Sequence, residues 1–163
     1  MSAELTPSQT VGPYFSLGLL DPPANELVPH GIRITGRVLD GAGKPVSDAM
    51  VEIWQADEEG RYQTHFGWGR SGCDHEGRYW FITCKPGRIE GQAPHLTVMV
   101  FARGLLKPVL TRMYFPDEED ANAADRVLAA VDDASTLVAR AADDGLEFDI
   151  RLQGDGETVF FAV

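Results

Sequence analysis

A few phenol, imidazole and guanidinium groups stand next to turn residues, and these side chains are the best placed to do chemistry. Tyr62 follows a Gly-Arg pair, His95 follows an Ala-Pro pair, and Arg103 precedes a glycine. Loops and strand ends on a rigid β-scaffold are where binding and catalytic residues concentrate. Arg103 is suited to a carboxylate, because its planar guanidinium can bind both carboxylate oxygens at once.

Each of these residues also has a simple structural interpretation, and both interpretations stay open at this point. A single tyrosine such as Tyr62 often packs with its hydroxyl bonded to a neighbour. His95 can be a structural histidine whose hydrogen bonds are satisfied, and Arg103 can form an ion pair at an interface. For Tyr62 and His95 taken as single residues, the structural interpretation is favoured.

Short strands must position these groups. Residues 32–39 alternate with period two, which is typical of a half-buried strand. The run that ends in Ile53 and Trp54 is apolar on both faces apart from Glu52, which predicts a central strand. The further strands that we expect are residues 79–83, 95–102 and 109–115, a hairpin of residues 137–141 and 146–152, and residues 158–161.

Three segments differ from this strand pattern. Residues 117–131 begin with acidic side chains and continue with apolar residues at helical spacing, which predicts one short helix. Residues 63–76 contain three glycines and few branched apolar side chains, so we expect a functional or interface loop. Residues 1–31 carry five prolines among apolar side chains. They predict an irregular arm that lies against this domain or against another chain.

These elements predict an all-β fold, with a single β-sandwich domain over residues 1–163. The N-terminal arm of residues 1–31 and the one short helix are its only departures from that pattern. A chain of 163 residues, 44% of them hydrophobic, is long enough to bury a substantial core. Seventeen glycines and ten prolines agree with many turns between short strands.

The composition excludes several classes of protein. A formal charge of -11 disfavours nucleic acid and anionic membrane surfaces as partners, because their phosphates would be repelled. No apolar run reaches membrane-spanning length, and the first residues lack the pattern of a signal peptide. Cys73 and Cys84 form neither a disulfide framework nor a metal-type pair. We therefore expect a cytoplasmic protein with free thiols.

Six motifs in a fixed order point to a known family. They are residues 6–14 (TPSQTVGPY), 51–57 (VEIWQAD), 85–87 (KPG), 93–95 (APH), 101–104 (FARG) and 154–161 (GDGETVFF). Together they resemble the intradiol ring-cleaving dioxygenases over essentially the whole chain. The resemblance implies Fe(III) held by two tyrosinates and two histidines, a ligand set that suits a hard ion favouring anionic oxygen.

The resemblance implies that half of this ligand set is missing here. Tyr62 and His95 match a tyrosine and a histidine of the family pattern, whereas Ile89 and Thr97 stand at the other two ligand positions. An isoleucine cannot ligate a metal, and a neutral threonine hydroxyl is a poor substitute for imidazole. These four residues are therefore expected to mark a vestigial site without metal, and the chain alone is expected to contain no catalytic residues and to be inactive.

The departure from the pattern implies a division of labour between two homologous chains. A β-type partner subunit is expected to hold Fe(III), where a small aromatic diol that carries a carboxylate reacts with O2. This chain, as the α-type subunit of an αβ hetero-oligomer, is expected to line that pocket with Thr10, Gly12, Pro13, Tyr14 and Arg103. The alternatives are a subunit of a related intradiol dioxygenase for another catechol, and a non-enzymatic β-sandwich binding module.

Overall fold

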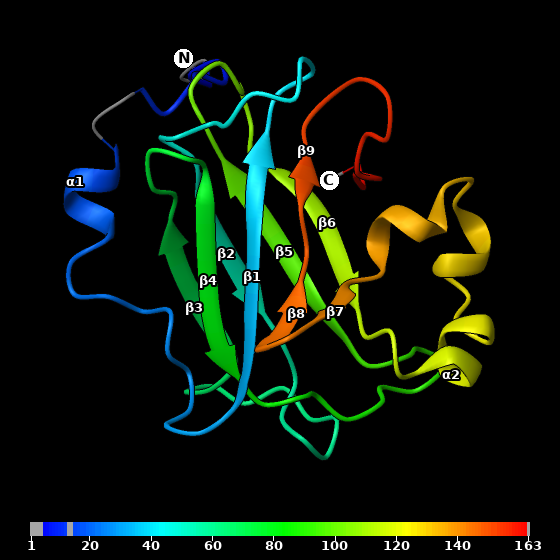
Figure 1. Cartoon of the computed structure of the whole chain (residues 1–163). Helices are drawn as coiled ribbons and strands as arrows, with labels where there is room; N and C mark the ends of the chain where they lie inside the picture. The colour runs from blue at the N-terminus through cyan, green and yellow to red at the C-terminus, as the bar shows by residue number, and fades with distance from the viewer. Residues whose placement is uncertain (1–4, 13–14, 163) are drawn as a thin grey trace.

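Two sheets packed face to face form the body of the molecule, and a computed structural model describes residues 5–12 and 15–162 (Figure 1). The first sheet has the order β4 (Arg78–Thr83), β1 (Ile32–Leu39), β8 (Gly145–Glu147) and β7 (Arg140–Ala142), and β9 (Ile150–Arg151) also pairs with β1. The second sheet has the order β3 (Trp68–Gly72), β2 (Met50–Trp54), β5 (His95–Phe101) and β6 (Val109–Tyr114). The predicted all-β sandwich is confirmed.

The core lies between the two sheets and follows from the period-two alternation of the strands. Ile34 of β1 is opposite Phe81 of β4, and both are buried. In the second sheet Val51 is opposite Val100 and Ile53 is opposite Val98, all of them buried. Removal of these apolar side chains from water stabilises the sandwich at roughly 25 cal/mol per Å².

The segment predicted as a loop at residues 63–76 instead contains a strand, β3, paired antiparallel with β2. It lacks branched apolar residues because other side chains cover its glycines. Leu27 lies where a Cβ of Gly69 would be, and Leu20 lies where a Cβ of Gly72 would be. The arm therefore supplies the apolar surface that the strand's own residues lack, and residues 20–27 of the arm lie on this domain.

The helical expectations need two corrections. Of the predicted helix over residues 117–131, only α2 (Glu119–Ala123) is α-helical, and the arm contains a short helix that was not predicted, α1 (Phe15–Leu19). Two 3-10 turns, Leu128–Ala130 and Ala134–Leu137, follow α2. Asp125 explains the break, because its carboxylate accepts hydrogen bonds from the backbone N–H groups of Val127 and Leu128, at 2.7 and 3.1 Å.

The C-terminal segment also differs from the expectation. The hairpin about residues 143–145 is present as β7 and β8, although its strands are shorter than predicted. Residues 158–161 do not form a strand, and only Phe161 makes an isolated bridge, to Leu110 of β6. Val159 and Phe161 pack instead against the small apolar cluster of Tyr114, Leu128 and Leu137.

Within the described residues no helix is long and apolar enough to cross a membrane.

Asp57 joins the two loops at the end of β2 that carry Tyr62 and Ile89. Its carboxylate accepts hydrogen bonds from Arg61 N at 2.8 Å and Gln63 Nε2 at 2.7 Å, and its carbonyl accepts one from Gly87 N at 2.8 Å. The loops approach so closely that a Cβ on Gly87 would lie 2.5 Å from the backbone nitrogen of Gly60. This contact requires glycine at position 87.

We expect Gly87→Ala to lower the free energy of unfolding by about 1–3 kcal/mol, because the added methyl forces two backbone segments apart. Gly18→Ala, in the helix α1, is the matched control, since a Cβ there meets nothing within 4 Å. It should leave stability unchanged or slightly increased. Urea denaturation of both variants measures the difference, and equal stabilities would contradict the close contact.

Candidate functional site

Strand register places the candidate Thr97 between two neighbours in one row across the outer face of the second sheet. Trp54 of β2 is opposite Thr97 of β5, and Thr97 is opposite Arg112 of β6. Two residues earlier on β5, His95 is opposite Tyr114. The loop that carries Tyr62 follows Trp54 at the end of β2, and the loop that carries Ile89 precedes β5, so all four positions lie at one end of this sheet.

Tyr62 stacks on Trp54, with ring centroids 6.0 Å apart and planes inclined by 6°. Its side chain is half exposed, and Trp54 next to it is also partly exposed. Trp54 is in turn the Cα partner of the exposed Trp68 on β3. Tyr62, Trp54 and Trp68 thus form a continuous exposed set of rings, called here the aromatic patch.

His95 is buried and held in one orientation. Its Nδ1 lies 2.8 Å from the carbonyl oxygen of Ala93, so Nδ1 carries the hydrogen and donates to that acceptor. The backbone N–H of Ala93 donates to the buried carboxylate of Asp125 at 2.7 Å. Burial lowers the pKa of His95, the Ala93 hydrogen bond opposes this, and the charge of Arg112 adds to the lowering. The imidazole is therefore neutral at neutral pH.

Arg112 was not among the residues that the sequence pointed to, yet it occupies the middle of this region. Its Nη1 donates to Gln92 Oε1 at 2.6 Å and to the Tyr114 hydroxyl at 3.2 Å. Burial raises the pKa of Tyr114, so the guanidinium is bonded to a neutral phenol. A charged residue at the centre of the apolar run of residues 109–115 was the signal that could have identified it.

Ile89 is the fourth position that matches a ligand of the family. It forms an isolated antiparallel bridge with Gln92, and Gln92 accepts a hydrogen bond from Arg112. The four matched positions offer one exposed phenol, one buried imidazole already bonded through Nδ1 and one threonine hydroxyl, and the neighbouring Tyr114 hydroxyl is bonded to a permanent cation. This set does not fit a ferric ion, which favours several anionic oxygen ligands and would be repelled by the guanidinium.

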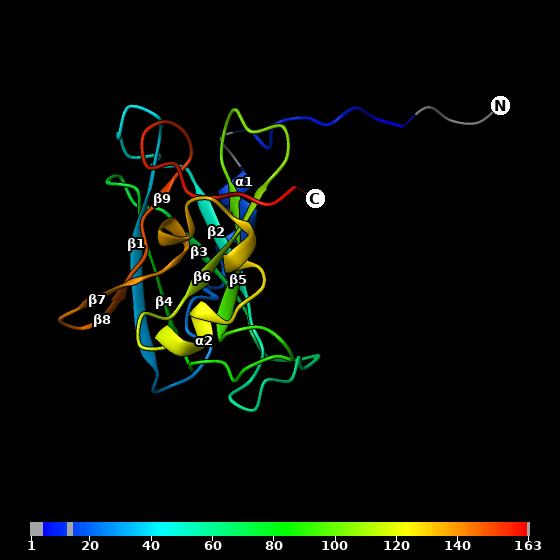
Figure 2. The same cartoon turned by 90° about the vertical axis from the view of Figure 1, so that its right-hand side faces the viewer.

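The proposed pocket-lining residues lie at the other end of β5. Arg103 follows that strand, and its Nε lies 2.5 Å from Asp48 Oδ2 in an ion pair, with 62% of the arginine side chain exposed. Thr10 Oγ1 accepts a hydrogen bond from the backbone N–H of Gly104 at 3.0 Å. Residues 5–9 of the arm extend away from the body of the domain (Figure 2).

This placement separates the candidate residues into two groups. The seven-residue strand β5 puts roughly 20 Å between His95 and Phe101, at about 3.3 Å per residue. The Thr10 and Arg103 group therefore does not line the vestigial site of its own chain. Gly12 takes a left-handed backbone conformation with φ of 73°. Pro13 and Tyr14 lie outside the described residues.

A model of the dioxygenase family matches residues 22–154 of this chain. The chain therefore belongs to this dioxygenase family, and the intradiol class inferred from its motifs is confirmed by its relatives. The protocatechuate 3,4-dioxygenase alpha chain of Burkholderia cepacia is 42% identical, over 97% of this chain and 97% of that relative.

Two further relatives add to the comparison. The protocatechuate 3,4-dioxygenase beta chain of Burkholderia cepacia is 35% identical, over 78% of this chain and 66% of that relative. The solved structure of the dioxygenase domain of a dioxygenase carbohydrate-binding protein fusion from Streptomyces sp. SirexAA-E superposes with a TM-score of 0.66 at 30% identity, over 93% of this chain and 99% of that one. This chain is thus similar to both kinds of chain named for one enzyme.

The lowered pKa of His95 predicts a pH-dependent stability. The unfolded state binds a proton below its ordinary pKa of about 6.5 and the folded state does not, so the free energy of unfolding falls as pH decreases through that range. One such proton contributes a slope of at most about 1.4 kcal/mol per pH unit. Urea denaturation of the wild type between pH 7.5 and 5.5 measures it.

His95→Gln should reduce this slope, whereas His75→Gln, at an exposed histidine, should retain it. If stability depended on pH equally in the wild type and in His95→Gln, His95 would have to bind a proton in the folded chain as well. That result would contradict a buried, neutral imidazole.

Proposed function

We propose that this chain is the metal-free α-type subunit of a protocatechuate 3,4-dioxygenase that acts in the cytoplasm. With a homologous β-type subunit it cleaves 3,4-dihydroxybenzoate with O2 between the two hydroxyl-bearing carbons, giving 3-carboxy-cis,cis-muconate. The observation that carries this proposal is the guanidinium of Arg112, which Gln92 and Tyr114 hold on the strand next to His95 and Thr97, two of the positions that match the family's ligands. Ile89 and Thr97 remove two of those ligands.

The partner supplies the iron in this proposal. Iron held by the partner would supply a Lewis-acidic centre to which the two catechol oxygens could bind, which would make the ring reactive toward O2. The similarity of this chain to both an alpha and a beta chain supports descent of the two subunits from one ancestor. One of the two subunits can lose its metal and the enzyme can stay active only if the other subunit keeps its metal. In this proposal the two chains therefore assemble.

The exposed apolar surface supports assembly with a partner. Leu17 of α1 is 77% exposed, and the aromatic patch of Tyr62, Trp54 and Trp68 is 38–48% exposed. Exposed aromatic side chains of this kind are enriched at protein interfaces, and contiguous apolar patches on a monomer usually mark one. In this proposal the partner covers both surfaces.

The N-terminal arm and Arg103 complete the partner's pocket. Thr10 ties the arm to the loop that carries Arg103, so the two move as one unit. Arg103 brings a cation from a chain of net charge -11, and an anionic substrate would otherwise be disfavoured by that charge. Gly12, Pro13 and Tyr14 follow Thr10 and provide the rest of the pocket wall.

Two free, half-buried thiols agree with a reducing compartment. Burial raises the pKa of the Cys73 thiol to about 12, and burial also raises the pKa of Cys84. Both stay protonated and unreactive at neutral pH.

Co-expression with a homologous β-type chain that carries the only affinity tag tests the proposal. We expect the two chains to co-purify with iron bound, to show a tyrosinate-to-iron absorption band, and to consume O2 with 3,4-dihydroxybenzoate. This chain purified alone should contain no stoichiometric iron. Stoichiometric iron in the chain alone would contradict the metal-free assignment.

The same experiment separates the alternatives. Activity with unsubstituted catechol and none with 3,4-dihydroxybenzoate would identify a related intradiol dioxygenase. Failure to co-purify, with no iron in either preparation, would identify a binding module.

Arg103 provides a sharper test of the pocket assignment. We expect Arg103→Ala in the assembled enzyme to raise KM about tenfold at unchanged iron content, because a hydrogen-bonded charge contact to the substrate carboxylate is lost. Asp48→Asn is the matched control, since it removes the ion pair and keeps the guanidinium. It should leave KM unchanged or lower it. If both variants dissociate the subunits and the complex that remains assembled has an unchanged KM, Arg103 has only an interface role.

A further inference from the structure

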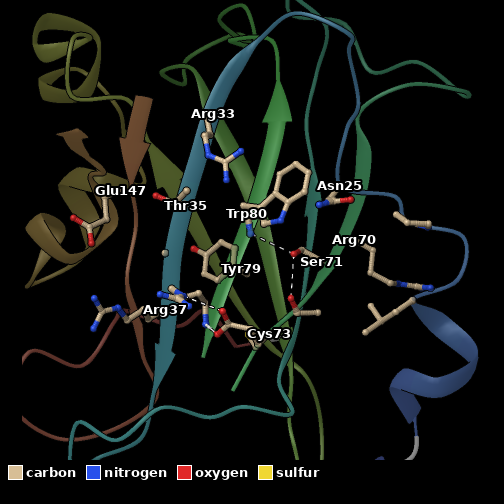
Figure 3. Close-up of a pocket in the computed structure, with 16 residues that line it drawn as sticks. Asn25, Arg33, Thr35, Arg37, Arg70, Ser71, Cys73, Tyr79, Trp80 and Glu147 are labelled. Carbon is tan, nitrogen blue, oxygen red and sulfur yellow. Dashed lines mark hydrogen bonds and ion pairs between the residues drawn. The ribbon is translucent and has the colours of Figure 1, made fainter. Parts of the chain in front are cut away.

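A hollow of about 620 Å³ lies on the outer face of the first sheet, away from the site described above (Figure 3). Its floor is formed by β1 and β4, and the N-terminal arm at Leu20, Pro23 and Asn25 forms one wall. A volume of this size is typical of sites for small organic molecules. Nothing in the proposed dioxygenase function uses this hollow.

Arginines dominate the charge of the hollow although the whole chain is strongly acidic. Arg33, Arg37, Arg70 and Arg78 line it together with only two carboxylates, Asp74 and Glu147. The chain as a whole carries 14 basic and 25 acidic residues, so this local excess of cations is the reverse of its average. A concave site lined by one sign of charge attracts ligands of the opposite sign.

The four guanidinium groups differ in how far their charge is already compensated. Arg70 is paired with Glu52 at 2.6 Å, and Arg78 is paired with Asp74 at 2.9 Å and with Glu76. Arg33 has only a contact of 3.5 Å with Asp144, a largely exposed residue. Arg37 has no ion pair within residues 5–12 and 15–162. The two β1 arginines therefore keep most of their charge for a ligand.

An aromatic side chain lies next to the first of these two cations. Arg33 and Arg37 are four residues apart on the same strand, so their side chains leave the sheet on the same face. Thr35 stands midway between them, and its partner on β4 is Trp80. The guanidinium of Arg33 lies 4.9 Å from the centroid of the Trp80 ring. The hollow thus offers two cations on one strand, with an indole beside the first of them.

We propose that this hollow binds a small aromatic dicarboxylate, with one carboxylate at Arg33, the other at Arg37, and the ring against Trp80. Guanidinium groups recognise carboxylates through paired N–H donors, and an indole face packs against an aromatic ring. A ligand with one carboxylate satisfies only one of the two cations. The site therefore distinguishes dicarboxylates from monocarboxylates.

Isothermal titration calorimetry of the full chain at 0.15 M NaCl tests this site, with isophthalate as the probe and benzoate as the monocarboxylate comparison. We expect saturable binding of isophthalate, about tenfold tighter than that of benzoate. Arg37→Gln should weaken isophthalate binding about tenfold and leave benzoate binding nearly unchanged. Thermal unfolding monitored by circular dichroism checks that each variant is folded.

Arg126→Gln is the matched control, because Arg126 is exposed and lies outside the hollow. It should bind isophthalate like the wild type. The proposal is overturned if isophthalate shows no saturable binding, if benzoate binds equally well, or if Arg126→Gln loses as much affinity as Arg37→Gln. The same titration of the co-expressed complex shows whether the partner leaves the hollow open. If the free chain binds isophthalate and the complex does not, the site exists only in the unassembled chain.

Discussion

The alternation of side chains along β5 is the constraint that ties the core of this molecule to its candidate site. Leu96, Val98 and Val100 point into the sandwich, and the residues between them point to the outer face. A shift of the pairing by one residue would exchange the two sets and expose the core. The register that buries the core therefore also fixes His95 and Thr97 on the outer face, opposite Tyr114 and Arg112.

That fixed register explains why the charge of Arg112 matters. On an outer sheet face an arginine is ordinarily free to extend into water, but Gln92 and Tyr114 hold this one beside the row of Trp54 and Thr97. A permanent cation held at this place works against binding of a trivalent cation there. Arg112 therefore lies next to the positions that match the family's iron ligands, on the strand that pairs with His95 and Thr97.

Much of this architecture follows from local patterns, and the exceptions have physical causes. The strands at residues 32–39 and 95–102 were predictable because each alternates over a buried face. The strand β3 was not, because its apolar cover comes from Leu20 and Leu27, which are distant in sequence. The length of α2 was not predictable either, because Asp125 uses its carboxylate to cap backbone groups after the break, a role invisible in helical spacing. The family motifs predict Tyr62, Ile89, His95 and Thr97 as the positions that match the ligands, whereas Arg112 became visible only from the register of β2, β5 and β6.

In the proposed enzyme this chain completes a metal site held by another chain. Crystallography of the co-expressed complex, with anomalous diffraction at the iron absorption edge, locates the metal directly. We expect one iron for each pair of chains, bound by the partner's residues, with Thr10 and Arg103 of this chain facing that pocket. An iron peak between Tyr62 and His95 of this chain would contradict it.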